Sequence, residues 1–301
     1  MSKNQKKKLS LTQFFAIYIG VLAIILLIVA LFSLIGKGDT KQLEATGTPV
    51  STETGSASPS PTEASATPVP SVSGSVSTPE PNTAELTGLK ITIDPGHQAK
   101  APSGTEKSAP WSDEEKRKNT EGTAGGKTGI DEYVVNLQIA LKLRDALTAK
   151  GATVVMTRDN HDTSLSNQDR AAISNENHVD VILSIHGNGS DNQSVSGTEV
   201  YYRGDGDGSA EYKARSAAEA ILAEKLINSV AEATGAKNRG AKKSDSYTGI
   251  NFANAPCFIL ECGFLSNPEE EANLISEAYQ AKIVTGVVNW LLENKAAIKP
   301  Q

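Results

Sequence analysis

Four ionisable residues stand where predicted strands end or where a predicted helix begins. His97 and His186 each come shortly after an apolar run that is typical of a buried strand. Glu261 closes a third such run, and Glu132 opens an amphipathic helical segment. The carboxyl ends of parallel strands share one edge of a sheet, where ligands bind. We therefore expect these four side chains to converge.

This set of side chains predicts metal-assisted hydrolysis. Two imidazoles and one carboxylate are the usual ligands of a hydrolytic zinc site, which keeps one position open for water. The remaining carboxylate can handle protons as a general base. Asp94 lies three residues before His97 and is a candidate partner for the second ring nitrogen of a ligating histidine. The residue types alone leave open which glutamate binds the metal.

Each of these residues also has a purely structural interpretation. A lone histidine after a strand commonly makes ordinary loop hydrogen bonds, and Glu132 could simply favour the positive end of its helix. A structural Glu261 would need a buried partner such as Arg239 to offset its desolvation. The expected convergence of four ionisable side chains favours a functional site over these structural roles. His161 fits a solvated loop and His178 the end of a short helix, so neither is assigned to the site.

Hydrophobic periodicity predicts alternating strands and helices from residue 87 to residue 298. The predicted strands are 89–93, 152–157, 179–185, 198–202 and 257–261; the predicted helices are 132–150, 168–177, 211–234 and a last one that Asn267 caps with Pro268 at its first position. This order predicts an α/β fold, with a mostly parallel twisted sheet, helices on both faces and a single catalytic domain.

The segment before this domain predicts a membrane anchor and a tether. Residues 14–35 are almost wholly apolar and can cross about 30 Å of hydrocarbon, and the lysines before them favour a cytoplasmic N-terminus. We expect residues 1–36 to form the cytoplasmic tail and transmembrane helix, although a cleaved secretory signal is the alternative. Residues 37–86 are rich in Ser, Thr and Pro, which predicts a disordered linker; a glycosylated stalk is the alternative. The catalytic domain is expected outside the cytoplasm.

Charge argues against a nucleic-acid partner. The net charge is −6 and the sequence pI is about 5.4, and the later sequence has no cluster of lysine and arginine to contact phosphates. Cys257 and Cys262 are too far apart along an extended strand to bridge, because a disulfide needs Cα atoms within about 7 Å. We expect both to be free.

Five ordered motifs resemble the zinc-dependent N-acetylmuramoyl-L-alanine amidases. These motifs are Ile93–His97, Glu132–Leu147, Val154–Arg158, Ser184–Asn188 and Glu261–Asn267. The resemblance covers residues 88 to 295. It implies that His97, Glu132 and His186 bind Zn²⁺ and that Glu261 activates water and protonates the leaving amine. The implied substrate is peptidoglycan, cut at the amide between lactyl group and L-alanine.

A long polar insert, residues 98–131, departs from that pattern, because many relatives have a shorter connection there. It begins and ends at predicted ligands, so we expect it to border the site and to shape the substrate groove or act as a lid. A mobile surface loop without a role is the alternative. Two other functions also stay open: a zinc hydrolase of another acyl or peptidyl amide, similar to a carboxypeptidase, and an inactive wall-binding regulator.

Overall fold

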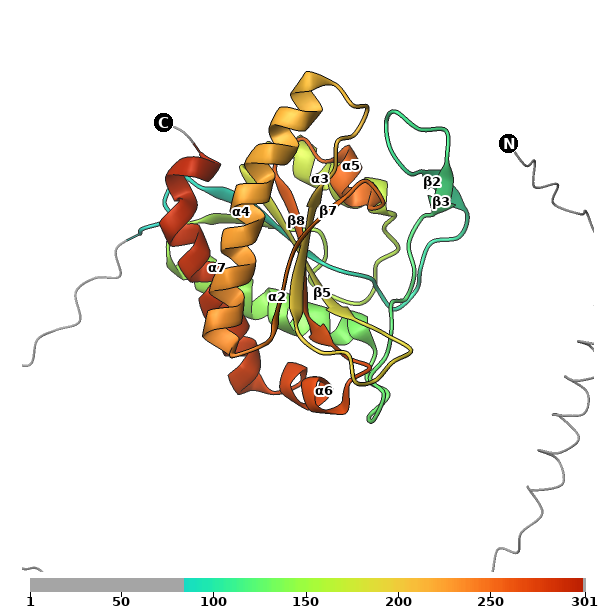
Figure 1. Cartoon of the computed structure of the whole chain (residues 1–301), viewed down its shortest axis with the longest axis vertical. Helices are drawn as coiled ribbons and strands as arrows, with labels where there is room; N and C mark the ends of the chain where they lie inside the picture. The colour runs from blue at the N-terminus through green and yellow to red at the C-terminus, as the bar shows by residue number, and fades with distance from the viewer. Residues whose placement is uncertain (1–83, 300–301) are drawn as a thin grey trace, which may run out of the picture. The chain divides into compact units, whose positions relative to one another are not determined.

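A six-stranded sheet forms the centre of the described part of the chain, residues 84–299 of a computed structural model (Figure 1). In sheet order the strands are β4 (Thr153–Met156), β1 (Lys90–Pro95), β5 (Val181–Asn188), β8 (Cys257–Phe264), β6 (Thr198–Arg203) and β7 (Asn238–Ser244). The first four run parallel, whereas β6 pairs antiparallel with β8 and parallel with β7. The expectation of a mostly parallel sheet is confirmed.

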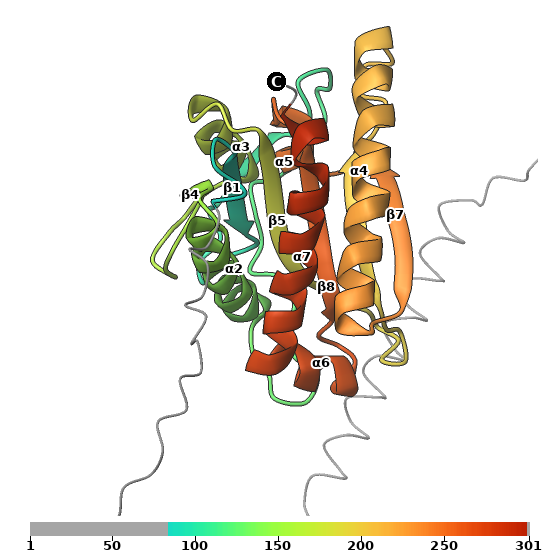
Figure 2. The ribbon, with the colours of Figure 1, turned by 90° about the vertical axis from the view of Figure 1, so that its left-hand side faces the viewer.

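Helices cover both faces of this sheet, as expected. The helices are α2 (Glu132–Ala149), α3 (Asn167–Glu176), α4 (Ala210–Thr234), α5 (Thr248–Phe252), α6 (Pro268–Leu274) and α7 (Glu277–Ile298). Figure 2 shows α2, α7 and α4 side by side over one face, in agreement with their mutual contacts. The shorter helices α3 and α5 contact each other and lie on the opposite face.

The two faces of the sheet carry cores of unequal size. Every second residue of β5 from Val181 to Ile185 joins a large apolar cluster with α2, α4 and α7. The intervening Ile182 belongs to a small second cluster, with Ile259 of β8 and Ile250 of α5. The face of this second cluster carries the short helices α3 and α5, and we call it the thinly covered face. Because successive strand residues point to opposite faces, every second residue after Ile182 and after Ile259 also lies on this face. This face leaves room for a site.

Several elements differ from the sequence-based expectation. Strand β7 was not expected because its sequence, NRGAKKS, lacks apolar alternation; it is an edge strand beside β6. The insert contains a short hairpin, β2 (Thr105–Lys107) with β3 (Glu115–Arg117). The expected last helix is two helices: α6 is capped by the side chain of Asn267 as predicted, and α7 begins at Glu277.

The predicted anchor and most of the predicted linker lie outside the described residues. Within residues 84–299, none of the helices is both long enough and apolar enough to span a membrane. Leu86, the last residue of the predicted linker, is fully buried in the large core. Cys257 and Cys262 are free and buried, so that expectation is confirmed.

Candidate active site

His97 lies in the turn after β1 and has a positive φ of 57°. Residues other than glycine seldom adopt this conformation, so surrounding contacts must hold it. Two buried arginines supply them. Arg170 donates to the carbonyls of Pro95 and His97, each at 2.8 Å. Arg158 donates to the carbonyls of Pro95 and Gly96 at 2.9 and 3.0 Å. The backbone that carries His97 is thus fixed from two sides.

Glu132 is the first residue of α2, as predicted, and its side chain is 5% exposed. The backbone N–H of Thr123 donates to Glu132 Oε2 at 2.9 Å, and the Asn136 amide donates to Oε1 at 3.0 Å. The positive end of the helix dipole also favours a carboxylate here. These contacts hold the side chain in one orientation at the start of the helix.

His186 and Glu261 project from the thinly covered face of the sheet. His186 continues the alternation that places Ile182 on that face, and Glu261 continues the alternation of Ile259. Both strands extend beyond the predicted ends, β5 to Asn188 and β8 to Phe264. Both residues therefore lie within their strands, near the carboxyl ends, whereas the sequence placed His186 just past its strand and Glu261 at the last position of its strand. A polar residue on this face does not terminate a strand.

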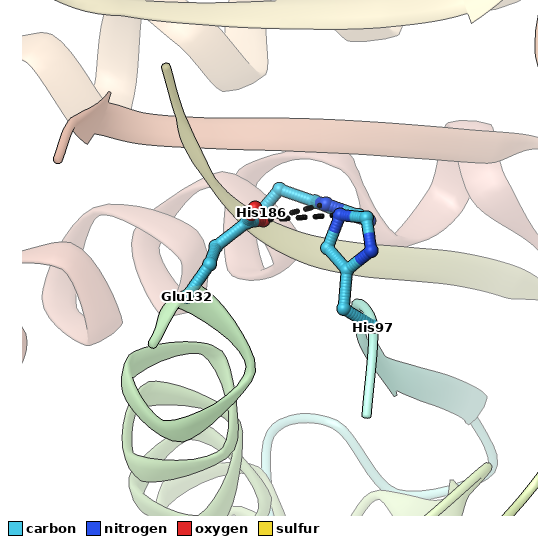
Figure 3. A group of neighbouring side chains, drawn as sticks. All are labelled: His97, Glu132 and His186. Carbon is cyan, nitrogen blue, oxygen red and sulfur yellow. Dashed lines mark hydrogen bonds and ion pairs between the residues drawn. The ribbon is translucent and has the colours of Figure 1, made fainter. Parts of the chain in front are cut away.

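The structure brings His97, Glu132 and His186 together as a candidate metal site (Figure 3). Glu132 Oε1 lies 3.4 Å from His97 Nε2 and 3.1 Å from His186 Nδ1, and one ligand atom from each of the three residues lies within 4.8 Å of the others. Donors bound to one zinc ion at about 2 Å lie roughly 3–4 Å apart. The spacing and the donor types fit such an ion.

Gly96 shapes this site by lacking a side chain. A Cβ on residue 96 would lie 2.2 Å from Cε1 of the His186 ring. The two imidazole rings meet edge to face, with centroids 4.9 Å apart. Gly122 has a similar role, since its Cβ would lie 2.6 Å from Glu132 Oε2. Close packing against glycine backbone therefore confines the candidate ligands.

The second ring nitrogen of His97 contacts the insert rather than Asp94. His97 Nδ1 lies 2.9 Å from the carbonyl oxygen of Thr120. Because a carbonyl can only accept, Nδ1 carries the proton and Nε2 keeps the lone pair that faces Glu132. The expected contact with Asp94 is wrong: its carboxylate accepts hydrogen bonds from Arg170, and from the hydroxyls of Thr157 and Ser184.

Mutual contacts shift the pKa values of the candidate ligands. Burial opposes ionisation of Glu132, but the hydrogen bond and charge of His186 dominate and lower the pKa of this carboxyl to about 2. Burial and the neighbouring His186 lower the pKa of His97. The pKa of His186 is raised by Glu132, although burial opposes this. The carboxylate of Glu132 thus stays ionised, which is the form that binds a cation.

Glu261 differs from Glu132 in its surroundings. Burial, with the charges of Glu132 and Glu199, raises its pKa to about 7, although His186 opposes the shift. Its Oε2 atom is buried and has no hydrogen-bond partner among residues 84–299. Arg239, the partner that a structural role would require, donates to Glu199 instead, at 2.8 Å. A buried carboxyl that exchanges protons near neutrality is suited to general acid–base catalysis.

Comparisons with known proteins identify the family. Residues 91–293 match the family model described as N-acetylmuramoyl-L-alanine amidase. The chain belongs to this family. It is therefore an enzyme that hydrolyses amides, and its substrate is the N-acetylmuramoyl-L-alanine amide of peptidoglycan. The family resemblance seen in its motifs is confirmed.

Individual relatives support this assignment. The uncharacterized protein YqiI of Bacillus subtilis is 32% identical over 204 residues, covering 68% of this chain and 92% of that protein. The N-acetylmuramoyl-L-alanine amidase LytC of B. subtilis is 30% identical over 202 residues, covering 67% of this chain and 34% of LytC. A crystal structure of an N-acetylmuramoyl-L-alanine amidase from Clostridium difficile is 27% identical, with a TM-score of 0.56 over 71% of this chain and 97% of that one.

In this amidase, two connected hollows meet at the candidate site. Both are lined by His97, Thr120, His186 and Glu261. The open arm has a volume of about 730 Å³ and is further lined by Gly122, Thr123, Glu132, Gly187–Asp191 and Ser266. The less open hollow, called the enclosed arm, has a volume of about 270 Å³ and lies between the insert, α3, the 246–250 segment and the thinly covered face of the sheet. Glu261 stands where the two arms meet.

The insert forms part of the amidase groove. The Asn251 amide donates to the carbonyl of Ser108 at 2.9 Å, and Glu106 accepts from the backbone N–H groups of Asn167 and Gln168 at the start of α3. Near the other end of the insert, the Glu271 carboxylate accepts hydrogen bonds from the backbone N–H groups of Lys127 and Thr128. The insert borders the site, as expected, because its residues line both hollows; whether it has a role in catalysis stays a prediction.

Sequence reasoning missed the residues that position the ligands. The sequence places Arg158 only within a motif and predicts no role for Arg170. It gives no defined structure to the insert that contains Thr120. Arg158 and Arg170 hold the His97 turn through backbone carbonyls, and Thr120 contacts His97 through its own carbonyl; such backbone contacts carry no residue-specific pattern. The one available signal was an arginine among the residues following a buried strand, as in Thr157-Arg158. His161 and His178 are exposed and stand apart from the candidate metal site, as expected.

Proposed function

We propose that this amidase is zinc-dependent and that His97, Glu132 and His186 hold the ion. The short distances among their donor atoms and the lowered pKa of Glu132 support this assignment. Two imidazoles and one carboxylate match the ligand set of catalytic zinc sites. When bound, zinc polarises the scissile carbonyl and lowers the pKa of water. The proton transfers of the reaction are carried out by a side chain of the protein.

Glu261 acts in this proposal as the group that moves the proton. Its carboxylate removes a proton from the attacking water, whose oxygen bonds to the lactyl carbonyl carbon. The carbon–nitrogen bond then breaks, and Glu261 returns the proton to the leaving amine of L-alanine. The products are a lactyl carboxylic acid and a peptide with a free amino terminus. The observation that carries this role is the raised pKa of a buried carboxyl whose Oε2 lacks a partner.

Product analysis tests the proposal. The full chain is incubated with purified peptidoglycan, and the products are separated by mass spectrometry with and without a chelator. We expect glycan chains without stem peptides and intact peptides with a new L-alanine amino terminus. Chelation should abolish both products and added Zn²⁺ should restore them. Glu261→Gln should abolish them while retaining the metal.

The same experiment separates the alternatives. Shortened peptides that remain attached to glycan would favour the carboxypeptidase-like hydrolase. A wild-type chain that binds peptidoglycan but releases nothing, with or without Zn²⁺, would favour the inactive regulator. Zinc-independent release of the expected products would overturn the metal assignment alone. His97→Ala provides the matched metal-free control for these reactions.

We further propose that residues 14–35 anchor the enzyme in the cytoplasmic membrane, with the domain facing the cell wall. The uncharged apolar run, the lysines before it and the Ser/Thr/Pro-rich 37–86 segment support this arrangement. Membrane fractionation and external protease digestion of intact protoplasts test it. We expect full-length enzyme in the membrane and digestion of the domain from outside. Recovery in the cytosolic fraction, or protection from protease, would contradict the proposal.

A further inference from the structure

The enclosed arm of the groove has a wall with a fixed position. The hairpin of β2 and β3 forms this wall and contributes Lys116 and Arg117 to its lining. The Lys116 ammonium donates to the carbonyl of Ser246 at 3.1 Å, which ties the hairpin to the segment before α5. The backbone N–H of Asn167 donates to the carbonyl of Lys118 at 2.8 Å, which ties it to α3. Arg117 lies between these two attachments.

Arg117 is the unpaired cation of this arm. Arg170 forms an ion pair with Asp94, with 2.6 Å between Nη1 and Oδ1. The Lys116 ammonium donates to the Ser246 carbonyl and lies 3.8 Å from the Glu114 carboxylate. Arg117 pairs with Thr105 through its backbone only; its side chain is exposed, and its guanidinium has no hydrogen bond or ion pair to any residue in the described range. A guanidinium presents several donors in one plane and pairs well with a carboxylate. Arg117 and Glu261 line the same arm, which therefore offers a free guanidinium to an anion bound there.

The shapes of the two arms suggest which part of the substrate each one takes. A glycan strand continues in both directions and needs an open groove, which the arm along Thr123 and Gly187–Asp191 provides. A stem peptide is a short branch and can enter the enclosed arm. Ile182 and Ile259 line that arm, with 4% and 8% of their surface exposed, and offer a small apolar contact to a side chain such as alanine. The scissile amide joins glycan to peptide and would lie at Glu261, where the arms meet.

From these observations we infer that the enclosed arm binds the stem peptide and that Arg117 pairs with a free carboxylate of that peptide. The enzyme thereby prefers an acidic peptide over its amidated counterpart. This inference rests on the amidase function, because it concerns the leaving group of that reaction. Arg117 is a specificity-determining residue in this assignment and takes no part in bond cleavage.

A pair of soluble muropeptides tests the inference. The two differ only in whether the acidic groups of the stem peptide are free carboxylates or primary amides. We expect wild type to cleave the acidic form with a kcat/KM roughly two- to fivefold higher, the effect of one exposed ion pair. Arg117→Ala should lose this preference, because KM for the acidic form should rise towards that for the amidated form.

Lys118→Ala is the matched control. It removes one positive charge from the same hairpin, but the side chain lines neither arm, so the preference should persist. Arg117→Ala enzyme that still prefers the acidic peptide would overturn the inference, as would equal preference in wild type. Loss of the preference in Lys118→Ala as well would also overturn it, because the effect would then be general hairpin charge. Wild type that cleaves neither muropeptide would instead overturn the amidase function.

Discussion

His186 and Glu261 are direct register partners in the neighbouring parallel strands β5 and β8. Their side chains point to the same face, because both continue the alternation that places Ile182 and Ile259 there. Of these two residues, His186 contacts Glu132, with 3.1 Å between Nδ1 and Oε1. The pairing of two buried strands thus holds a candidate ligand and a proton-transfer group side by side, without depending on a loop.

This arrangement predicts that Glu261→Gln separates catalysis from metal binding. The substitution keeps the side-chain volume but removes the acid–base group, so kcat should fall by about 10²- to 10⁴-fold. Zinc content per chain, measured by mass spectrometry of the purified enzyme, should not change. Glu224→Gln makes the same chemical change at an exposed position of α4 that lines neither arm, and it should leave kcat within about twofold of wild type. Loss of zinc in Glu261→Gln would show that Glu261 is itself a ligand.

Gly96→Ala should weaken metal binding without removing any ligand. The added methyl group would lie 2.2 Å from the His186 ring, which must then move away from Glu132. We expect zinc affinity to fall roughly 10- to 100-fold, the effect of changes that reorient a ligand. Competition with a chromogenic chelator measures this. Gly249→Ala is the control, because its Cβ would meet nothing within 4 Å. Wild-type affinity in Gly96→Ala would contradict the packing argument.

The convergence of the candidate ligands could be predicted from the sequence because of where each one stands relative to a strand or helix. A histidine or glutamate within an otherwise apolar strand is costly unless it has a role, and the order of strands and helices places such residues on one side of the sheet. Glu132 was recognisable as a helix start. These predictions used local periodicity and one general property of parallel sheets.

The supporting contacts could not be predicted, because they join residues that are far apart in the chain. Asp94 pairs with Arg170, 76 residues later, where the sequence suggested a nearby histidine. Strand β7 consists mostly of polar residues and is defined by pairing with β6 rather than by its own pattern. The insert has few apolar residues, and its position depends on contacts such as Asn251 with Ser108.

Glu271 should be required to hold the segment that leads to Glu132. Its buried carboxylate accepts the backbone N–H groups of Lys127 and Thr128 at 2.8 Å each, and the Thr128 hydroxyl at 2.5 Å. Glu271→Ala leaves these donors unpaired, so we expect the free energy of unfolding to fall by about 2–3 kcal/mol. Zinc affinity should fall too, since the released segment immediately precedes Glu132. Urea denaturation and chelator competition measure the two effects.

Glu269→Ala controls for charge on the same helix. Glu269 is exposed in the first turn of α6, so its side-chain removal should change the free energy of unfolding by no more than about 0.5 kcal/mol. If Glu271→Ala were as stable as Glu269→Ala, the carboxylate would not be anchoring the segment.

The Asp94–Arg170 pair should make the enzyme sensitive to acid. Burial opposes ionisation of Asp94, but Arg170 and the hydroxyls of Ser184 and Thr157 lower its pKa from 3.8 to about 2. The unfolded chain therefore binds a proton at Asp94 more readily than the folded chain does. The resulting stabilisation is present above about pH 4 and is lost as the pH falls towards 2. Its size is about 2 kcal/mol.

Acid titration of stability in wild type and Asp94→Asn measures this contribution. Asp94→Asn leaves Arg170 buried without its partner, so at neutral pH it should be less stable by about 3–5 kcal/mol. Between pH 5 and pH 2 the free energy of unfolding of wild type should fall by about 2 kcal/mol more than that of Asp94→Asn. Both proteins are titrated without metal, so metal release does not contribute to this difference. Parallel curves for the two proteins would mean that Asp94 carries no such linkage, and the turn holding His97 would then depend on its carbonyl contacts alone.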